Sequence, residues 1–356
     1  MTMRKWGGPF VFVVLVFAAA VSPRPRSADA EELLLPPRGF QWRLGPPVLA
    51  PVERPEDPCY SVKDPSVVFY KDRWHLFCTI RSQKRSHQIE YLSFRDWPEA
   101  KRVKRRILRV TDGYFCAPQV FYYRPHRCWY LIYQVVDQAR KPALQPAFST
   151  TTDLADAESW TPPRLLFERQ PKHVKRWIDF WVICDEERAH LFFTSLDGKM
   201  WRAETTRDRF PHGWSPPAVV LTADIFEAAH IYRLKGRKQF LAIIEAQTHG
   251  RSYWRYYKAF LADRLDGPWK PLAASHEQPF ASPVNVRETA DHWTDNISHG
   301  ELLRAGYDER LLVDPGRLRL LFQGVTNQAR RGKPYGQIPW RLGLLEPASG
   351  DESPGR

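Results

Sequence analysis

The chain has 356 residues, of which 43% are hydrophobic and 26% charged, a balance that suits a folded protein and excludes wholesale disorder. Aromatic residues make up 13%, with 31 Pro and only 3 Met, and this mixture favours a β-rich chain with many turns over a helix bundle. The formal net charge is +13, so an anionic partner such as nucleic acid has to be considered.

The first thirty residues have the pattern of an export signal. Arg4 and Lys5 precede an unbroken apolar run from Phe10 to Val21, and Ala28-Asp-Ala30 supplies small residues for cleavage. A run this short does not span a bilayer comfortably, so we expect removal of residues 1–30 and a secreted protein, extracellular or periplasmic, without a membrane attachment. An uncleaved anchor is the alternative. Export argues against nucleic acid as the partner.

The remaining chain divides into three predicted parts. Residues 31–58 are Pro-rich and are expected to form an arm packed on the domain, residues 59–346 form that domain, and residues 347–356 form a flexible tail. Five cysteines occur without CxxC spacing or a histidine cluster, which argues against structural zinc, and their odd number leaves at least one thiol outside intrachain disulfides.

Five segments of the domain share one pattern: an apolar strand, a charged or Gly-containing turn, and a second apolar strand. About 65 residues per unit suffice for a four-stranded blade, so the sequence predicts an all-β, five-bladed β-propeller, with a β-sandwich as the alternative. The five segments are Pro65–Phe77, Gln119–Gln134, Phe180–Phe193, His230–Glu245 and Leu311–Gln323.

Three acidic residues lie in apolar sequence near the starts of these segments: Asp64, Asp179 and Glu227. Because the innermost strands of a propeller point into one funnel, we expect the three carboxyl groups to converge there. Two carboxyls, one giving a proton and one activating water, perform glycoside hydrolysis, and a third acid raises the pKa of the proton donor by repulsion. The alternative for each acid is a turn or cap, which Asp-Pro favours at Asp64.

A series of short stretches matches one known family in order. They are Phe40-Gln-Trp42, Lys63-Asp-Pro-Ser-Val-Val68, Ala117-Pro-Gln-Val-Phe121, Trp129-Tyr-Leu-Ile-Tyr-Gln134, Trp177-Ile-Asp-Phe-Trp-Val-Ile-Cys-Asp185, Phe226-Glu-Ala228, Ser298-His-Gly-Glu301 and Ile338-Pro-Trp-Arg-Leu-Gly-Leu344. On these residues the chain resembles glycoside hydrolase family 62, the arabinoxylan arabinofuranohydrolases, from about Phe40 to Leu345. Families 43 and 32 share the propeller and the Asp-Pro start but not the full series.

The resemblance implies an inverting α-L-arabinofuranosidase that acts on arabinoxylan or arabinoxylo-oligosaccharides. Asp64 corresponds to the general base, Glu227 to the general acid, and Asp179 to the residue that keeps the pKa of the acid high. Inversion then predicts a separation of roughly 6.5–9.5 Å between the Asp64 and Glu227 carboxyls.

Further residues are assigned by the same resemblance. Lys63 and Tyr335 correspond to pocket residues that hold the arabinose, and Trp177 is predicted to contact substrate, since aromatic rings stack on sugars. His299 corresponds to a histidine associated with a calcium ion, partly through water, although calcium prefers oxygen ligands. We expect no organic cofactor and a monomer.

The chain also departs from the family pattern. Gly336 stands where relatives commonly have Asn, a second cysteine after Cys184 is replaced by a stretch containing His190, and a basic insert, Lys172–Arg176, is expected to border the cleft. These differences bear on linkage preference more than on reaction type.

Three other functions remain open from the sequence. One is another propeller glycosidase, an arabinanase or β-xylosidase; another is a carbohydrate-binding propeller without catalysis; the third is a nucleic-acid binder. The positive charge is also consistent with a preference for acidic, glucuronate-bearing xylan, while an Arg-rich composition is the plainer explanation.

Overall fold

The computed structural model describes residues 1–2, 39–248 and 253–348. The predicted signal peptide, most of the predicted tail and the first part of the predicted arm therefore lie outside the described residues. The chain divides into a unit Met1–Leu33 and a unit Leu34–Arg356, and the fold below is that of the second unit. Among the described residues, no helix has both the length and the apolar character needed to cross a membrane.

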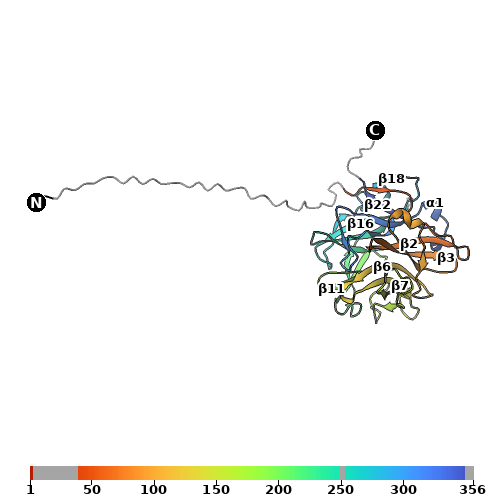
Figure 1. The fold of residues 1–356 in the computed structure, drawn as a ribbon, viewed down its shortest axis with the longest axis horizontal. Helices are drawn as coiled ribbons and strands as arrows, with labels where there is room; N and C mark the ends of the chain where they lie inside the picture. Colours follow the sequence, from red (N-terminus) through yellow and green to blue (C-terminus); the bar gives the residue numbers. More distant parts are fainter. Residues whose placement is uncertain (3–38, 249–252, 349–356) are drawn as a thin grey trace, which may run out of the picture. The chain divides into compact units, whose positions relative to one another are not determined.

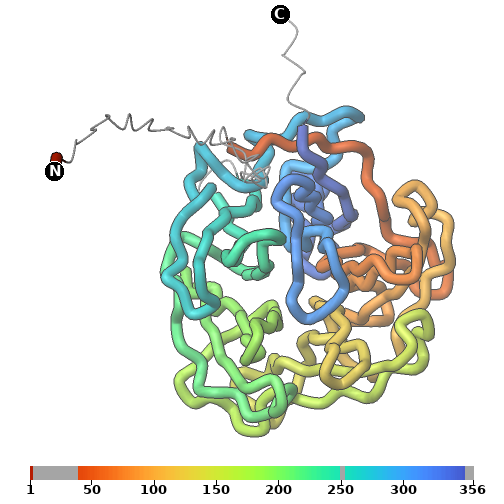
Figure 2. Tube along the Cα trace, turned by 60° about the vertical axis from the view of Figure 1, so that its left-hand side comes forward, coloured from red at the N-terminus to blue at the C-terminus, as the bar shows by residue number. Residues whose placement is uncertain are grey.

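Five sheets, in which most neighbouring strands are antiparallel, follow one another around a ring, so the predicted all-β, five-bladed β-propeller is confirmed (Figures 1 and 2). Blade 1 consists of β2 (Cys59–Tyr70), β3 (Arg73–Ser82), β4 (Gln88–Phe94) and β5 (Arg106–Ile107). Blade 2 consists of β6 (Phe115–Tyr123), β7 (Cys128–Val136), β8 (Leu144–Thr151) and β9 (Arg164–Leu165). Blade 3 consists of β10 (Ile178–Cys184), β11 (Arg188–Thr194), β12 (Lys199–Thr206) and β13 (Ala218–Thr222).

Blades 4 and 5 each contain five strands. Blade 4 is built from β14 (His230–Leu234), β15 (Phe240–Gln247), β16 (Arg255–Ala262) and β17 (Lys270–Ala273), with β20 (Leu312–Val313) paired to β14 in parallel. Blade 5 has the strand order β19 (Ser298–Leu302), β21 (Leu320–Gly324), β22 (Arg341–Pro347), β1 (Trp42–Leu44) and β18 (Val286–Glu288). Helical turns are short: η1 (Trp97–Lys101), η2 (Arg124–His126), η3 (Pro283–Asn285), α1 (Asn327–Arg330) and η4 (Tyr335–Gln337).

The ring is closed by pairing the two ends of the domain. Strand β1 lies antiparallel to β22, so a segment near the start of the domain joins a segment near its end in one sheet. The expectation of an arm lying on the domain is wrong for this part, because Trp42 and Leu44 alternate with exposed Arg43 and are buried as in a sheet strand.

The fifth predicted hairpin, Leu311–Gln323, is also wrong. Its first half is β20, which belongs to blade 4, and the true innermost strand of blade 5 is β19. The sequence of β19, Ser-His-Gly-Glu-Leu, is polar although all five residues are buried, so hydrophobic patterning does not reveal it. Gly300 is required there, because a Cβ would lie 2.4 Å from the Leu321 carbonyl oxygen.

The innermost strands of blades 1, 2 and 3 each carry a β-bulge near the funnel end. The bulge residues Asp64, Ala117 and Asp179 have φ of 48°, 53° and 58°, and the left-handed conformation turns their N–H groups out of the ladder. A side chain of the preceding blade accepts a hydrogen bond from each of these N–H groups: Gln323 (2.9 Å), Thr79 (2.9 Å) and Gln134 (3.3 Å) in turn. The blades are thus held to one another where the acidic residues lie.

The other end of the central channel is closed by residues 304–313. Arg304 donates to the carbonyl oxygens of Val67 (2.9 Å) and Val120 (2.8 Å), in blades 1 and 2. The same segment accepts backbone hydrogen bonds from Cys184 of blade 3 (2.8 Å) and Arg233 of blade 4 (3.2 Å). Because this segment binds the far ends of the inner strands, the funnel has a floor.

Candidate active site

The bulges bring Asp64, Asp179 and His299 together at the funnel end of three blades. The His299 Nδ1 atom lies 3.5 Å from Asp64 Oδ1 and 3.7 Å from Asp179 Oδ2, although the three residues belong to blades 1, 3 and 5. Burial lowers the pKa of His299, so the ring is neutral between the two acids.

Asp64 is held in its ionised form. Burial by itself would raise its pKa, but the Lys63 ammonium, 3.6 Å from Asp64 Oδ2, together with His299 and a hydrogen bond from Thr79 outweighs burial, and the pKa lies below its ordinary value. Lys63 in turn donates to the Tyr335 hydroxyl (3.4 Å), and its ammonium lies 4.8 Å from the centre of that ring. Tyr335 is 48% exposed and so lies at the open side of this group.

Asp179 has the opposite electrostatic environment. Burial and the negative charges of Glu227, Asp64 and Glu245 raise its pKa well above the ordinary value. Its Oδ2 atom accepts a hydrogen bond from the N–H of Ala228 (3.1 Å), the residue after Glu227. One buried carboxyl of the site is therefore protonated while another, Asp64, is charged.

Glu227 is bound by an arginine that sequence reasoning missed. Arg255, the first residue of β16, donates to Glu227 Oε1 (2.5 Å) and to Glu245 Oε1 (3.0 Å) with the same Nη1 nitrogen. Glu227 Oε2 accepts no hydrogen bond from a described residue. The arginine thus fixes one oxygen of Glu227 and leaves the other for chemistry.

Glu245 is the second functional residue that the sequence reading missed. It is fully buried in β15, its Oε2 accepts from the N–H of His299 (2.7 Å), and both its oxygens accept from Ser298 Oγ (3.0 and 3.1 Å). Burial raises its pKa to about 7 in spite of Arg255. A signal was present, because Glu245 interrupts an apolar strand and Arg255 stands between Trp254 and Tyr256.

The wall beside Lys63 contains Cys116 and Tyr114. The Cys116 thiol donates a hydrogen bond of 3.1 Å to the Tyr114 hydroxyl. Burial raises the pKa of Cys116 to about 12, so the thiol stays protonated and unreactive. All five cysteines, Cys59, Cys78, Cys116, Cys128 and Cys184, are unpaired.

The departure at Gly336 has a structural counterpart. A Cβ at this position would lie 2.8 Å from Arg81 Nε and 3.1 Å from Arg81 Nη2. The Arg81 guanidinium therefore occupies the space beside Tyr335 that a larger side chain at 336 would need.

The prediction that Trp177 contacts the substrate is wrong. Its ring is 1% exposed, its Nε1 donates to the carbonyl oxygen of Leu144, and it packs edge-on against Phe180 and Phe193. A ring enclosed in this way offers no face to a sugar. Trp177 is part of the blade core.

The calcium expectation for His299 stays a prediction. Calcium takes six to eight oxygen ligands, and among residues 39–248 and 253–348 no three His, Cys, Asp or Glu side chains form a group suited to a metal. The side chains around His299 do not by themselves fit such an ion, so most of its ligands would have to be water. No step described below passes through a metal.

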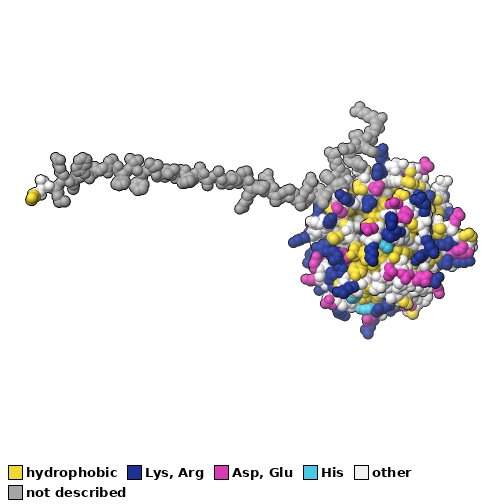
Figure 3. Space-filling view, viewed as in Figure 1, with side chains coloured by type: hydrophobic (Ala, Val, Ile, Leu, Met, Phe, Trp, Pro, Cys, Tyr) yellow, Lys and Arg dark blue, Asp and Glu magenta, His cyan; other side chains and the backbone are white. Residues whose placement is uncertain are grey.

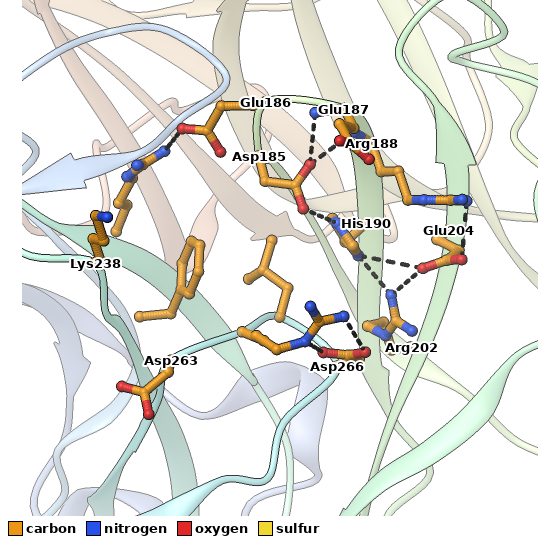
Figure 4. A pocket seen from close by; sticks show the side chains of 14 residues that line it. Asp185, Glu186, Glu187, Arg188, His190, Arg202, Glu204, Lys238, Asp263 and Asp266 are labelled. Atoms are coloured by element: carbon orange, nitrogen blue, oxygen red, sulfur yellow. Dashed lines mark hydrogen bonds and ion pairs between the residues drawn. The ribbon is translucent and has the colours of Figure 1, made fainter.

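A second cavity, of about 620 Å³, lies between blades 3 and 4 at the ends of the strands opposite the funnel (Figure 4). His190, the departure noted in the sequence, contributes to its wall; its Nε2 contacts Asp185 (2.9 Å) and its Nδ1 contacts Arg202 (2.7 Å). Arg202 also pairs with Glu204. Since these charged side chains satisfy one another, we interpret the cluster as structural.

Comparisons with known proteins agree with this geometry. Residues 50–346 match the model of glycosyl hydrolase family 62. Alpha-L-arabinofuranosidase C of Cellvibrio japonicus (strain Ueda107) is 36% identical over 304 residues, which are 83% of this chain and 46% of that protein; the chain thus spans about half the length of this curated relative.

Two solved structures are similar over nearly their whole length. The catalytic domain of the Coprinopsis cinerea GH62 alpha-L-arabinofuranosidase has a TM-score of 0.80 and 34% identity, covering 88% of this chain and 98% of that one. A GH62 hydrolase in complex with xylotriose has a TM-score of 0.79 and 33% identity, covering 86% and 97%. With five blades, a funnel of buried carboxyls and a family match over most of its length, the chain belongs to glycosyl hydrolase family 62.

Proposed function

We propose that the chain is an inverting α-L-arabinofuranosidase that removes arabinofuranose side chains from arabinoxylan. The observation that carries the proposal is the pair of opposite electrostatic environments in one funnel: Asp64 is charged beside Lys63, and Asp179 is neutral beside Glu227. Hydrolysis of a glycosidic bond requires an ionised base and a proton donor; Asp64 supplies the first, and the protonated Asp179 lies next to the proposed donor, Glu227. The family relatives named above as arabinofuranosidases support the sugar.

In the proposed reaction, Asp64 is the base. It removes a proton from a water molecule as the water oxygen attacks the anomeric carbon of arabinofuranose. Lys63 keeps Asp64 ionised before the reaction, and its ammonium and the Tyr335 hydroxyl are available to hold sugar hydroxyls.

Glu227 is the proposed acid. Its Oε2 gives a proton to the bridging oxygen as the bond between that oxygen and the anomeric carbon breaks, so the xylan leaves as a neutral alcohol. Arg255 holds the other oxygen of Glu227, and Asp179 fixes the following peptide through Ala228. A direct attack by water leaves the released arabinose with inverted configuration.

The floor of the funnel supports a branch sugar as the occupant. Residues 304–313 close the channel, so a polymer has no passage along the propeller axis, and only a chain end or a side branch can fill the funnel. Xylan would then lie across the mouth, and the relative in complex with xylotriose agrees with a xylan backbone as the partner.

The experiment is proton NMR of the sugar released from arabinoxylan, from arabinan and from xylo-oligosaccharides. Arabinose from arabinoxylan with the inverted anomer appearing first is expected. Release from arabinan alone, xylose from xylo-oligosaccharides, or a retained anomer would identify another propeller glycosidase, and no release from any of them would indicate a binding protein. Singly and doubly substituted arabinoxylan fragments then define the linkage preference.

The location of the protein is a separate proposal. We propose export with removal of residues 1–30, which predicts a mature chain that begins at Glu31. N-terminal sequencing of the protein recovered from the medium or periplasm tests it; a chain that retains Met1 in the membrane fraction would contradict it.

A further inference from the structure

Two basic segments directly precede residues of the site in the sequence. Residues 169–176 lead into β10 and its bulge, and residues 327–335 lie between β21 and β22 and lead into Tyr335. Together they contain seven Lys and Arg residues and no Asp or Glu. Six of the seven are exposed: Arg169, Lys172, Lys175, Arg176, Arg331 and Lys333.

These cations have no acidic partner among the described residues, as is also true of Lys101, Arg102 and Lys104. The face in Figure 3 shows Lys and Arg interspersed with Asp and Glu. Many basic side chains pair with acids, such as Arg264 with Asp266 (2.8 Å) and Arg188 with Glu204 (3.0 Å). Among the described residues, none of the six exposed cations forms an ion pair, and the seventh, Arg330, lies over the Tyr253 ring at 3.9 Å. The two segments therefore carry uncompensated positive charge.

The segments are also close to the reaction centre. Arg176 precedes Asp179 by three residues, which span at most about 11 Å even when fully extended. Lys333 precedes Tyr335 by two residues, and the Tyr335 hydroxyl accepts from Lys63 (3.4 Å). Blades 3 and 5, which carry the two segments, are separated by blade 4, so the positive charge is present on two sides of the funnel.

Both segments are anchored. In the first, Val174 is buried in the core, as is Trp177 directly after the segment, and the His173 ring contacts the Pro217 carbonyl oxygen (2.7 Å). In the second, the Thr326 side chain accepts from the N–H of Ala329 (3.1 Å), and the Asn327 amide donates to the Tyr253 carbonyl oxygen (2.6 Å). The cations are thus presented from fixed loops, which reduces the entropy lost when they bind a ligand.

We propose that these two segments bind the carboxylates of uronic acid substituents on the xylan, so that the substrate is an acidic arabinoxylan. The inference rests on the proposed function, which lays xylan across the funnel mouth. An anionic group on a polysaccharide at that place is a uronate, and ammonium and guanidinium groups are its natural complements. A nucleic acid would not require the charge to border the sugar funnel.

The test uses one polymer in two forms: an arabinoxylan that carries glucuronate, and the same polymer after reduction of its carboxyl groups to neutral alcohols. Arabinose release is measured at about 20 mM and about 500 mM NaCl. At low salt, KM for the acidic form is expected to be roughly three- to tenfold lower than for the reduced form, as several exposed ion pairs would give. Salt should remove the difference, because exposed charges are screened.

Variants show which residues are responsible for the difference in KM between the two polymer forms. The triple variant Lys172→Ser, Lys175→Ser, Arg176→Ser is expected to move the ratio of the two KM values part of the way towards one, and a wild-type ratio in this variant and in the variant of the second segment would overturn the inference. The matched control, Lys101→Ser, Arg102→Ser, Lys104→Ser, removes the same charge from exposed positions beyond the far end of β4 and should retain the wild-type ratio. The double variant Arg331→Ser, Lys333→Ser tests the second segment.

The outcomes separate this inference from the proposed function. Equal KM values for both polymer forms with the wild-type protein would overturn the inference while arabinose release continues. Loss of the preference in the control as well as in the triple variant would also overturn it, since net charge alone would then be responsible. No arabinose release from either form would instead overturn the proposed function.

Discussion

The carboxyl of Asp179 accepts a hydrogen bond from the backbone N–H of Ala228, 3.1 Å away, and so binds the peptide that follows Glu227. Neutral side chains of the preceding blade cap the equivalent N–H groups of Asp64 and Ala117. The N–H of Ala228 is instead bound by Asp179, a buried acid whose pKa is well above its ordinary value. The same residue therefore positions the proposed proton donor and contributes a labile proton to its surroundings.

Asp179→Asn is expected to lower kcat and to raise Tm at neutral pH. Asn still accepts the Ala228 hydrogen bond but cannot share a proton with Glu227, so kcat should fall by about 10²-fold or more. Because the folded state binds the Asp179 proton more tightly than the unfolded state, wild-type stability declines as pH rises above the ordinary Asp value. The variant lacks this decline. Its Tm should exceed that of the wild type at pH 7, by roughly 2–4 °C for each kcal/mol gained, and by less at pH 4.

Scanning calorimetry across this pH range measures the effect. Asp179→Ala is the control, because it removes both the carboxyl and the hydrogen-bond acceptor and should not be stabilised at pH 7. A Tm difference between Asp179→Asn and wild type that does not grow with pH would contradict the assignment of the proton to Asp179.

The roles of Glu227 and Asp64 can be distinguished by comparing substrates whose leaving groups differ in acidity. Glu227→Gln and Asp64→Asn should each reduce arabinose release from arabinoxylan by about 10²–10⁴-fold, with the fold intact. A substrate with an acidic phenol as leaving group needs no proton, so Glu227→Gln should recover much of its rate on a dinitrophenyl arabinofuranoside. Asp64→Asn should not recover, because water still has to be activated. Equal recovery in both variants, or in neither, would argue against these roles.

Lys63 is expected to determine the pH at which kcat/KM falls in acidic solution. The ammonium offsets burial and lowers the pKa of Asp64, so Asp64 remains an active base in acidic solution. Lys63→Met removes the largest of the effects that oppose burial, so the pKa of Asp64 should rise and the acid limb of kcat/KM should move to higher pH. Lys63→Arg keeps the charge and should keep the limb near its wild-type position. An unchanged limb in Lys63→Met would show that another group controls it.

The fold was predictable from the sequence where strands are apolar. Hairpins such as Pro65–Phe77 and Phe180–Phe193 are buried on both faces, so each reads as a continuous β-branched and aromatic run. The innermost strand of blade 5 was not predictable in this way. The buried Ser298 hydroxyl and His299 backbone N–H both donate to Glu245 from another blade, and that partnership exists only in three dimensions.

The same distinction applies to the site. Asp64, Asp179 and Glu227 were recognisable because each is an isolated charge in apolar sequence with a family match. Glu245 and Arg255 have the same isolated character, but their importance lies in pairing with each other and with Glu227. The burial of Trp177 could not be predicted either. An aromatic residue next to an acid in the sequence is equally compatible with a place in the core and with stacking on a sugar, and only the packing decides between them.

Arg255 is predicted to act on stability and on catalysis separately. Arg255→Met leaves the fully buried Glu245 without its cation, which should cost roughly 3–5 kcal/mol in the free energy of unfolding. The double variant Arg255→Met, Glu245→Gln removes that buried charge and should recover much of the stability. It should still lose about 10²-fold in kcat, because nothing then holds Glu227 Oε1.

Urea denaturation and steady-state kinetics on the same preparations distinguish the two effects. If kcat returned together with stability in the double variant, Arg255 would have only a structural role.

Gly336 should tolerate a larger side chain and gain a substrate contact. A Cβ at this position meets Arg81 Nε at 2.8 Å, but the guanidinium is the end of a flexible side chain and can move away, so Gly336→Asn and Gly336→Ala should each change Tm by no more than about 2 °C. The family pattern has Asn at this position, and its amide is a hydrogen-bond donor and acceptor beside Tyr335. Gly336→Asn should therefore bind arabinose more tightly than Gly336→Ala, measured as product inhibition. Since both variants displace Arg81 but only Asn adds an amide, equal inhibition constants would mean that the amide makes no contact with the sugar and that the position of Arg81 alone decides affinity.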